Sequence, residues 1–241
     1  IENAEEAVYE EKKMEETEVC FLMDRFGYMR LIDKNAYERN KEAAHAENKF
    51  IFTCMNTDKI CIFTDMGRMH SIKVADIPLV RFRDKGTPAD NLSNYDSSQE
   101  QILYVAPVGQ VKLSTLLFVT KTSMCKLVAG EEFDVAKRTI ASTKLGEEDQ
   151  LIFVGPADEM EQVVFQSLNG YFLRILKTDV STMKKTSVGV RGMKLGDGDV
   201  LEHAYLVEPR QEYTIQYHDK PYALNKVKLA KRDTKGMKPR I

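Results

Sequence analysis

The chain has 241 residues, with 35 Lys and Arg against 37 Asp and Glu and a formal net charge of −2. Its 43% of hydrophobic residues suffices for a core, but no apolar run reaches the roughly 20 residues of a membrane-spanning helix, so we expect no membrane partner. The chain opens on Ile1 and an acidic stretch, without the pattern of a signal peptide, and we read it as a piece of a longer polypeptide. Taken alone, the near-neutral charge argues against nucleic acid.

Residues 1–17 are acidic and hold the only helical periodicity of any length, over Asn3–Glu16. We expect this stretch to be a linker or a segment that closes the fold. From residue 18 onward the chain repeats a unit of two apolar, alternating runs around a short polar turn. Five such strand–turn–strand units follow one another: Val19–Asp33, Ile60–Val74, Leu116–Val128, Val163–Leu176 and Glu212–Asn225.

Four further apolar runs lie between these units, about 50 residues apart, which is typical of propeller blades and related arrays. They are Lys49–Met55, Gln101–Pro107, Gln150–Gly155 and Val200–Val207. The seven phenylalanines Phe21, Phe52, Phe63, Phe118, Phe153, Phe165 and Phe172 fall in predicted strands, and we expect them to pack in the core rather than stack on bases.

The turns of the strand–turn–strand units differ in sequence. Gly27, Gly67 and Gly170 stand where a tight hairpin turn needs a positive φ. Ser123 and the pair Lys220–Pro221 replace glycine in the other two units, and we expect turns of another type there.

Each unit ends in a polar loop, for example Arg81–Ser93 or Met183–Asp199. A small sheet cannot bury both of its faces alone, so the units must pack against one another. We predict an all-β fold in which residues 18–241 form a single domain of five blade-like repeats.

The four cysteines are Cys20, Cys54, Cys61 and Cys125, and no two of them have the two-residue spacing of a zinc or redox motif. Three of them stand in apolar stretches. The pattern predicts small buried side chains in a reducing cytosol.

The charge is unevenly distributed along the chain. Residues 1–167 carry a net charge of −9 and residues 168–241 a net charge of +7. Basic residues recur at comparable positions of the repeats, and in a ring of similar blades such positions share one rim. A basic rim fits the phosphate backbone of double-stranded DNA. We predict DNA contacts from Arg68, Lys73, Arg81, Arg83, Lys85, Lys126, Arg174, Lys177, Lys184, Lys185, Arg191, Lys194, Lys226, Lys228, Lys231 and Arg232.

The loop Lys184–Asp199 (KKTSVGVRGMKLGDGD) strongly resembles the blade-ending loop of the C-terminal domains of DNA gyrase A and topoisomerase IV A subunits. Ile62–Lys73 and Ile77–Leu92 are similar to the hairpin and the matching loop of the same family, and the resemblance spans residues 18–241. It implies a β-pinwheel, a propeller-like ring of about five four-stranded blades that exchange strands. It also implies that the domain binds and bends duplex DNA on its outer rim and presents it to the cleavage core.

The partners implied by the resemblance are double-stranded DNA, the catalytic core of the same subunit, and the ATPase subunit of the topoisomerase, an ATP-hydrolysing isomerase. The cleavage tyrosine, the metal-binding domain and the ATPase of the family lie outside this domain. The residues agree, because we find no phosphate-binding loop, zinc ligand set or nucleophile elbow. We therefore predict no catalytic residue, no metal and no cofactor here, and a place at the nucleoid in the bacterial cytoplasm.

One stretch departs from the gyrase pattern. Gyrase A domains carry a glycine-rich, arginine-containing box after the first hairpin, whereas Tyr37–Phe50 (YERNKEAAHAENKF) has no glycine and no paired arginines. The departure, together with five units, favours topoisomerase IV over a divergent gyrase A subunit that wraps DNA for supercoiling. A protein-interaction propeller is a further alternative, favoured by the acidic first three repeats. A propeller enzyme would need a converging histidine or carboxylates, and His45, His70, His203 and His218 stand in unrelated places.

Overall fold

The computed structural model describes residues 15–241, which form five antiparallel sheets in chain order. The first joins β1 (Glu18–Met23), β2 (Tyr28–Asp33), β3 (Phe50–Met55) and β6 (Thr87–Pro88), and the second joins β4 (Lys59–Thr64), β5 (Arg68–Lys73), β7 (Ile102–Pro107) and β10 (Thr139–Ala141). The third joins β8 (Thr115–Thr120), β9 (Met124–Ala129), β11 (Leu151–Pro156) and β14 (Val190–Arg191). The fourth joins β12 (Gln162–Ser167), β13 (Phe172–Leu176) and β15 (Leu201–Val207), and the fifth joins β16 (Thr214–Tyr217) and β17 (Lys220–Ala223).

Each of the first four sheets is assembled from more than one repeat. A hairpin such as β1–β2 supplies two strands, and the next apolar run adds a third on one side. On the other side, a short strand arrives from the loop that ends the following repeat: β6 pairs with β2, β10 with β5, and β14 with β9. In the fourth sheet this role falls to Met237, which exchanges two backbone hydrogen bonds with Phe172.

We call the four returning segments the exchange loops: residues 77–93, 134–146, 180–196 and 227–239. Short helical turns precede them, namely η1 (Val74–Asp76), η2 (Gly130–Phe133), η3 (Lys177–Asp179) and η4 (Leu224–Lys226). The all-β, strand-exchanging β-pinwheel predicted from the sequence is confirmed. Only the first three sheets have four strands each; the fourth has three and the fifth has two.

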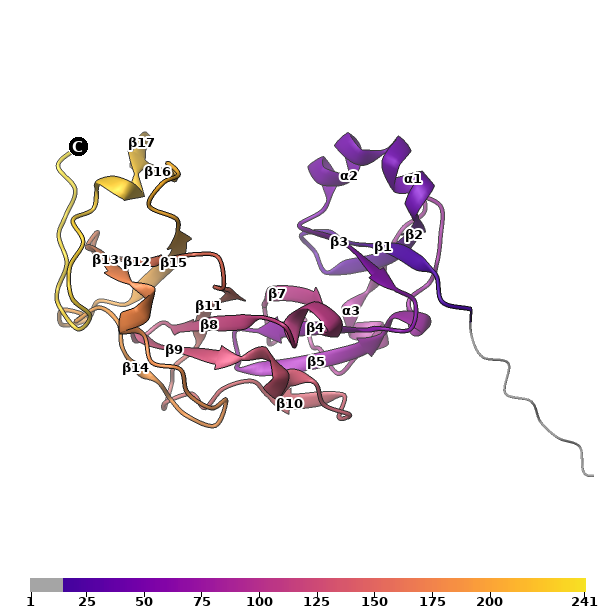
Figure 1. The fold of residues 1–241 in the computed structure, drawn as a ribbon, viewed down its shortest axis with the longest axis horizontal. Helices are drawn as coiled ribbons and strands as arrows, with labels where there is room; N and C mark the ends of the chain where they lie inside the picture. The colour runs from indigo at the N-terminus through magenta and orange to yellow at the C-terminus, as the bar shows by residue number, and fades with distance from the viewer. Residues whose placement is uncertain (1–14) are drawn as a thin grey trace, which may run out of the picture.

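The five sheets follow one another along an open arc (Figure 1). The first sheet lies at one end of the arc and β16–β17 at the other. On the concave side, the inner strands β3, β7, β11 and β15 contact one another in that order. The exchange strands β10 and β14 lie on the convex side (Figure 1). The outer edge is therefore built from the exchange loops.

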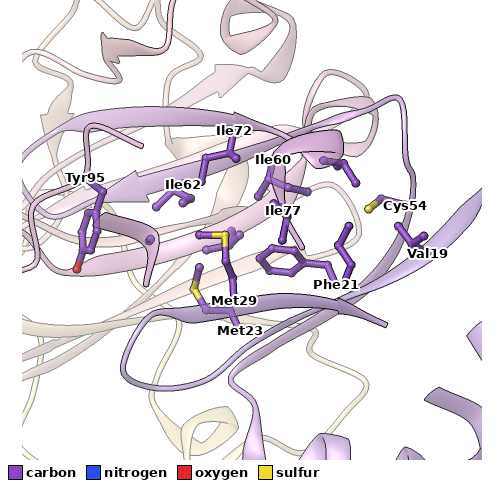
Figure 2. Packing of buried hydrophobic residues seen from close by; sticks show 14 residues of the cluster. Val19, Phe21, Met23, Met29, Cys54, Ile60, Ile62, Ile72, Ile77 and Tyr95 are labelled. Carbon is purple, nitrogen blue, oxygen red and sulfur yellow. The ribbon is translucent and has the colours of Figure 1, made fainter. Parts of the chain in front are cut away.

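The core is divided into clusters that lie between consecutive sheets. Figure 2 shows the cluster between the first two sheets, where Phe21 and Met29 of one sheet meet Ile62 and Ile72 of the other. Corresponding clusters join the second sheet to the third, the third to the fourth and the fourth to the fifth. Burying each such side chain contributes about 1.5–3 kcal/mol, so the stack of sheets is the main source of stability.

The predicted core phenylalanines lie as expected. Five of the seven are at most 1% exposed, and Phe52 and Phe153 are half-buried against the clusters. The four cysteines are buried and unpaired, as predicted.

The first sheet has a second apolar face, which the sequence pattern left without a cover. Two helices, α1 (Lys34–Arg39) and α2 (Lys41–Glu47), pack there and bury Ala36 and Ala44 against Cys20, Leu22 and Ile32. The expectation that helical periodicity is confined to Asn3–Glu16 is therefore wrong, and most of that stretch lies outside the described residues. Two further helices, α3 (Ala89–Leu92) and α4 (Val108–Val111), are single turns.

The hairpin turns confirm one prediction and correct another. Gly27, Gly67 and Gly170 have φ values of 81°, 68° and 88°. Ser123, however, has a φ of 73°, so it adopts the same left-handed conformation as the glycines. Its hydroxyl accepts a hydrogen bond from the Met193 N–H at 2.8 Å, which helps to hold this conformation. The fifth turn is made by His218 and Asp219, not by Lys220–Pro221, and both of its residues have positive φ.

Candidate nucleic-acid interface

The four exchange loops touch one another and form a continuous belt along the outer edge. Arg138 donates to the Leu92 carbonyl at 3.0 Å, which joins the second loop to the first. The Thr143 hydroxyl donates to the Ser187 carbonyl at 3.5 Å and joins the second to the third. The Lys194 N–H donates to the Thr234 carbonyl at 2.9 Å and joins the third to the fourth. We call the residues of the four exchange loops together the belt.

Close backbone approach positions the third loop. Gly189 has a φ of 111°, and a Cβ placed there would lie 2.6 Å from the Cys125 carbonyl oxygen. A Cβ on Gly192 would lie 2.7 Å from the ring of Phe165. Both glycines of the Gly-Val-Arg-Gly sequence are thus needed for β14 to reach β9, which explains this loop motif in packing terms.

The belt is strongly basic although the chain is not. Its residues include 15 Lys and Arg but only 4 Asp and Glu, a net charge of +11. The remainder of the chain, which includes residues 1–14, therefore carries −13. The near-neutral total hides this separation, and a surface of one sign attracts an extended partner of the opposite sign.

Most of the predicted DNA-contacting cations are exposed. These are Arg68, Lys73, Arg81, Arg83, Lys85, Lys184, Arg191, Lys194, Lys226, Lys228 and Lys231. Eight of them belong to the belt, whereas Arg68 and Lys73 lie on β5 and Lys226 in η4. Arg81 and Arg191 form exposed ion pairs with Asp84 and Asp233 at 3.3 and 3.4 Å, contacts that are weak enough to exchange for phosphate. Their contact with DNA stays a prediction.

The structure corrects the prediction that Lys126 contacts DNA. Its side chain is 1% exposed, and its Nζ donates to the carbonyl oxygens of Lys184 and Lys185 at 3.0 Å each and to that of Ser187 at 2.5 Å. Burial lowers the pKa of Lys126 to about 8, although the nearby Glu132 raises it. An amine enclosed in this way cannot reach a phosphate, so Lys126 holds the third exchange loop in place.

Four other predicted contacts are half-buried and hydrogen bonded to backbone. Arg174 donates to the Val227 carbonyl at 2.6 Å, and Lys177 to the Ala157 carbonyl at 2.7 Å. Lys185 donates to the Glu132 carbonyl at 2.9 Å, and Arg232 to the Arg191 carbonyl at 2.8 Å. These side chains support the loops that carry the exposed cations.

Sequence reasoning missed several cations of the belt as sites. Lys137 and Arg138 of the second loop are exposed. The amines of Lys235 and Lys238 lie 4.9 and 5.2 Å from the ring centroid of Tyr171. Their spacing after the strand–turn–strand unit was a usable signal, since both pairs fall in the repeated loop.

A buried polar cluster also escaped sequence analysis. Glu100 accepts hydrogen bonds from the Thr64 hydroxyl at 2.8 Å and lies 3.1 Å from His70 Nε2, while His70 Nδ1 lies 2.9 Å from the Thr139 hydroxyl. Burial raises the pKa of Glu100, but hydrogen bonds from His70, Thr64 and the Asp96 N–H outweigh it and lower the pKa. His70 and Glu100 are 1% and 3% exposed, so the pair is closed to a substrate and fastens β10 to β5.

Within residues 15–241, no group of three His, Cys, Asp or Glu side chains is placed to hold a metal ion. In the same part of the chain, no helix has the length and apolar character needed to cross a membrane.

The arc of strand-exchanging sheets places this domain in the class of propeller-like repeat domains. A family model described as "DNA gyrase C-terminal domain, beta-propeller" matches residues 58–97, 114–158 and 161–208, more than half of the chain. The chain therefore belongs to this family of gyrase C-terminal domains.

Individual relatives agree with the family. The chain is 25% identical over 208 residues to the DNA gyrase A protein of Lawsonia intracellularis, a match that covers 81% of this chain and 25% of the relative. It thus spans about a quarter of the length of that relative. A solved C-terminal domain of DNA topoisomerase IV matches with a TM-score of 0.82 and 22% identity over 93% of this chain and 73% of that one. A DNA gyrase A C-terminal domain matches with a TM-score of 0.62 and 18% identity over 92% and 76%.

Proposed function

We propose that this domain binds and bends duplex DNA along the belt, as the non-catalytic C-terminal part of a topoisomerase IV A subunit. The observation that carries the proposal is the continuity of the belt: four loops from four repeats, joined by hydrogen bonds, hold a net charge of +11 on one convex edge. Duplex DNA carries about one charge per 1.7 Å, so a curved row of cations can follow a curved duplex.

Two observations favour topoisomerase IV over gyrase A as the parent protein. Residues 37–50 fold mainly as α1 and α2, which cover the first sheet, in the stretch where a gyrase domain is expected to carry its glycine-rich box. The structural likeness to the topoisomerase IV domain, with a TM-score of 0.82, also exceeds the 0.62 of the gyrase domain.

The proposal places the remaining steps outside this domain. The catalytic core of the same subunit cleaves DNA, the ATPase subunit supplies the energy, and this domain delivers the duplex, with no cofactor of its own. We further propose that the protein works at the nucleoid in the bacterial cytoplasm, because the curated relatives are subunits of bacterial DNA topoisomerases.

A salt titration tests the electrostatic mechanism. Duplex affinity measured by fluorescence anisotropy should fall steeply with salt, with a logarithmic slope of about −0.9 for each phosphate neutralised. The double variant Lys184→Glu/Lys228→Glu should weaken binding at least about tenfold and reduce the slope by about 2, because two exposed phosphate contacts are lost.

The double variant Lys41→Glu/Lys112→Glu is the matched control, since both lysines are exposed, lie outside the belt and give the same change of charge. Equal losses in the two variants would place the duplex on another face. Salt-insensitive or absent DNA binding, together with a specific protein partner in a pull-down, would instead favour a protein-interaction propeller.

A further inference from the structure

A hollow of about 760 Å³ lies beside the turn of the first hairpin, against the first exchange loop. This volume is within the range of sites that enclose small ligands. Its lining includes three aromatic rings, those of Phe26, Tyr28 and Phe82, and three cations, Arg30, Arg83 and Lys85. Three carboxylates, Asp24, Glu47 and Asp84, complete its charged lining.

The aromatic side chains at this turn are exposed. Phe26 is 69% and Tyr28 41% exposed. The Arg25 guanidinium lies 4.7 Å from the centroid of the Phe26 ring. The residues that precede the turn position in the next three hairpins are Met66, Thr122 and Asn169, so the aromatic residue is specific to the first of these four. An exposed ring next to cations is a surface on which a flat, electron-rich group can stack.

The environment of the Arg30 side chain also points to a ligand. It lies three residues after the turn glycine, at the position of His70 and Lys126 in the next two repeats. His70 and Lys126 are hydrogen bonded beneath their exchange loops. The Arg30 side chain makes no hydrogen bond or ion pair within residues 15–241, and its Nε is buried without a partner. Its guanidinium carbon lies 5.5 Å from the centroid of the Phe82 ring, a contact that leaves the Nε–H without an acceptor. A buried guanidinium N–H without an acceptor calls for an anionic or polar group in the adjoining hollow.

The carboxylates of the hollow do not cancel this demand. Asp24 accepts hydrogen bonds from the N–H groups of Phe26 and Tyr28 at 2.9 and 3.0 Å. Asp84 is paired with Arg81 at 3.3 Å. Asp24 is therefore already hydrogen bonded and Asp84 already has a cationic partner, whereas Glu47 is exposed and can accept a hydrogen bond from the N3–H of an unpaired thymine.

We propose that this hollow binds one unpaired nucleotide of DNA. The base stacks on the rings of Phe26 and Tyr28, and the phosphate is held by the guanidinium of Arg30 together with Arg83 and Lys85. The base must stand outside the helix, because a paired and stacked base offers no free ring face. This inference rests on the proposed function, since the hollow adjoins the belt along which the duplex is placed.

Fluorescence anisotropy with three DNAs of equal length tests the proposal: an intact duplex, one with a single extrahelical thymidine, and one with a single extrahelical abasic residue. The abasic DNA keeps the additional backbone residue but lacks the base. We expect the thymidine DNA to bind about tenfold more tightly than the abasic DNA, within the range that base–aromatic stacking supplies. Phe26→Ala should remove this difference, Phe26→Tyr should keep it, and neither should change binding of the intact duplex.

Leu168→Ala is the control, because Leu168 is 59% exposed at the turn of the fourth hairpin. It should leave the preference for the thymidine DNA unchanged. Thymidine monophosphate, added as a competitor, should reduce that preference without displacing the intact duplex. Equal affinity of the protein for the thymidine and abasic DNAs, with salt-sensitive binding of the intact duplex retained, would overturn the nucleotide site and leave the proposed function standing. Failure to bind any of the three DNAs would overturn the proposed function itself.

Discussion

In the second and third repeats, the side chain three residues after the turn residue fastens the exchange loop, each time in a different way. In the second repeat His70 lies between Glu100 and Thr139, and in the third Lys126 donates to three carbonyls. In sequence, both residues look like ordinary polar positions of an alternating strand. Their partners come from loops 30 to 69 residues away, so only the fold reveals that they are buried.

Lys126 gives a pH-dependent prediction at this scale. Its folded pKa of about 8 lies below the ordinary value of 10.5, so between these values the unfolded chain binds one proton more than the folded one. The free energy of unfolding should therefore gain up to about 1.4 kcal/mol per pH unit from this group as the pH rises through that window. Nuclear magnetic resonance of the lysine side chain measures the pKa, and urea unfolding at pH 7, 8.5 and 10 measures the stability.

Lys126→Met isolates the contribution, because it keeps the aliphatic stem and removes the titrating amine. The difference in unfolding free energy between wild type and variant should grow in favour of wild type as the pH rises. A Lys126 pKa of 10 or above would contradict this prediction, because the three carbonyl acceptors would then offset the effect of burial.

At the scale of elements, the exchange strands are too short to be stable alone. β6 and β14 have two residues each, and their position depends on the loop that precedes them. The same two-residue pairing recurs in different sheets because each loop approaches the backbone of the preceding hairpin closely.

Gly189→Ala tests this dependence. The added Cβ would clash with the Cys125 carbonyl at a φ that disfavours side chains, so we expect a loss of about 2–3 kcal/mol of stability or displacement of β14. Gly196→Ala, seven residues further on, meets no atom within 4 Å and should change stability by less than about 0.5 kcal/mol. Urea unfolding compares the two, and equal effects would refute the close-approach explanation.

The first sheet is closed by helices instead of a preceding sheet. The Asp33 carboxylate accepts a hydrogen bond from the Ala36 N–H at 2.8 Å and caps α1. This cap and the alanines at 43, 44 and 46 are helix signals in the sequence, although they stand within a pattern of repeated strands. A terminal repeat with its own cover is the usual solution in repeat folds.

At the scale of the whole molecule, an open arc with cations on its convex edge should bend a duplex without winding it into a full chiral turn. Ligation of a nicked plasmid in the presence of excess domain should therefore give little or no change in linking number. Lys184→Glu/Lys228→Glu serves as the control for DNA binding in the same assay. A strong positive shift in linking number would contradict this prediction and favour the gyrase alternative.

The repeat, the all-β class, the hairpin positions and the core phenylalanines follow from the sequence alone, because alternation and turn residues act over a few neighbouring positions. The identity of each sheet's outer strand was decided only by the tertiary structure, because exchange joins residues as far apart as Met69 and Ile140. Contacts between residues far apart in the sequence also decide which cations are exposed. Lys126 and Lys184 carry the same charge, but Lys126 is enclosed by the loop that contains Lys184. The net charge of the whole chain, −2, alone argued against DNA binding. The fold gathers four separate loops on one edge, and the belt that they form carries a net charge of +11.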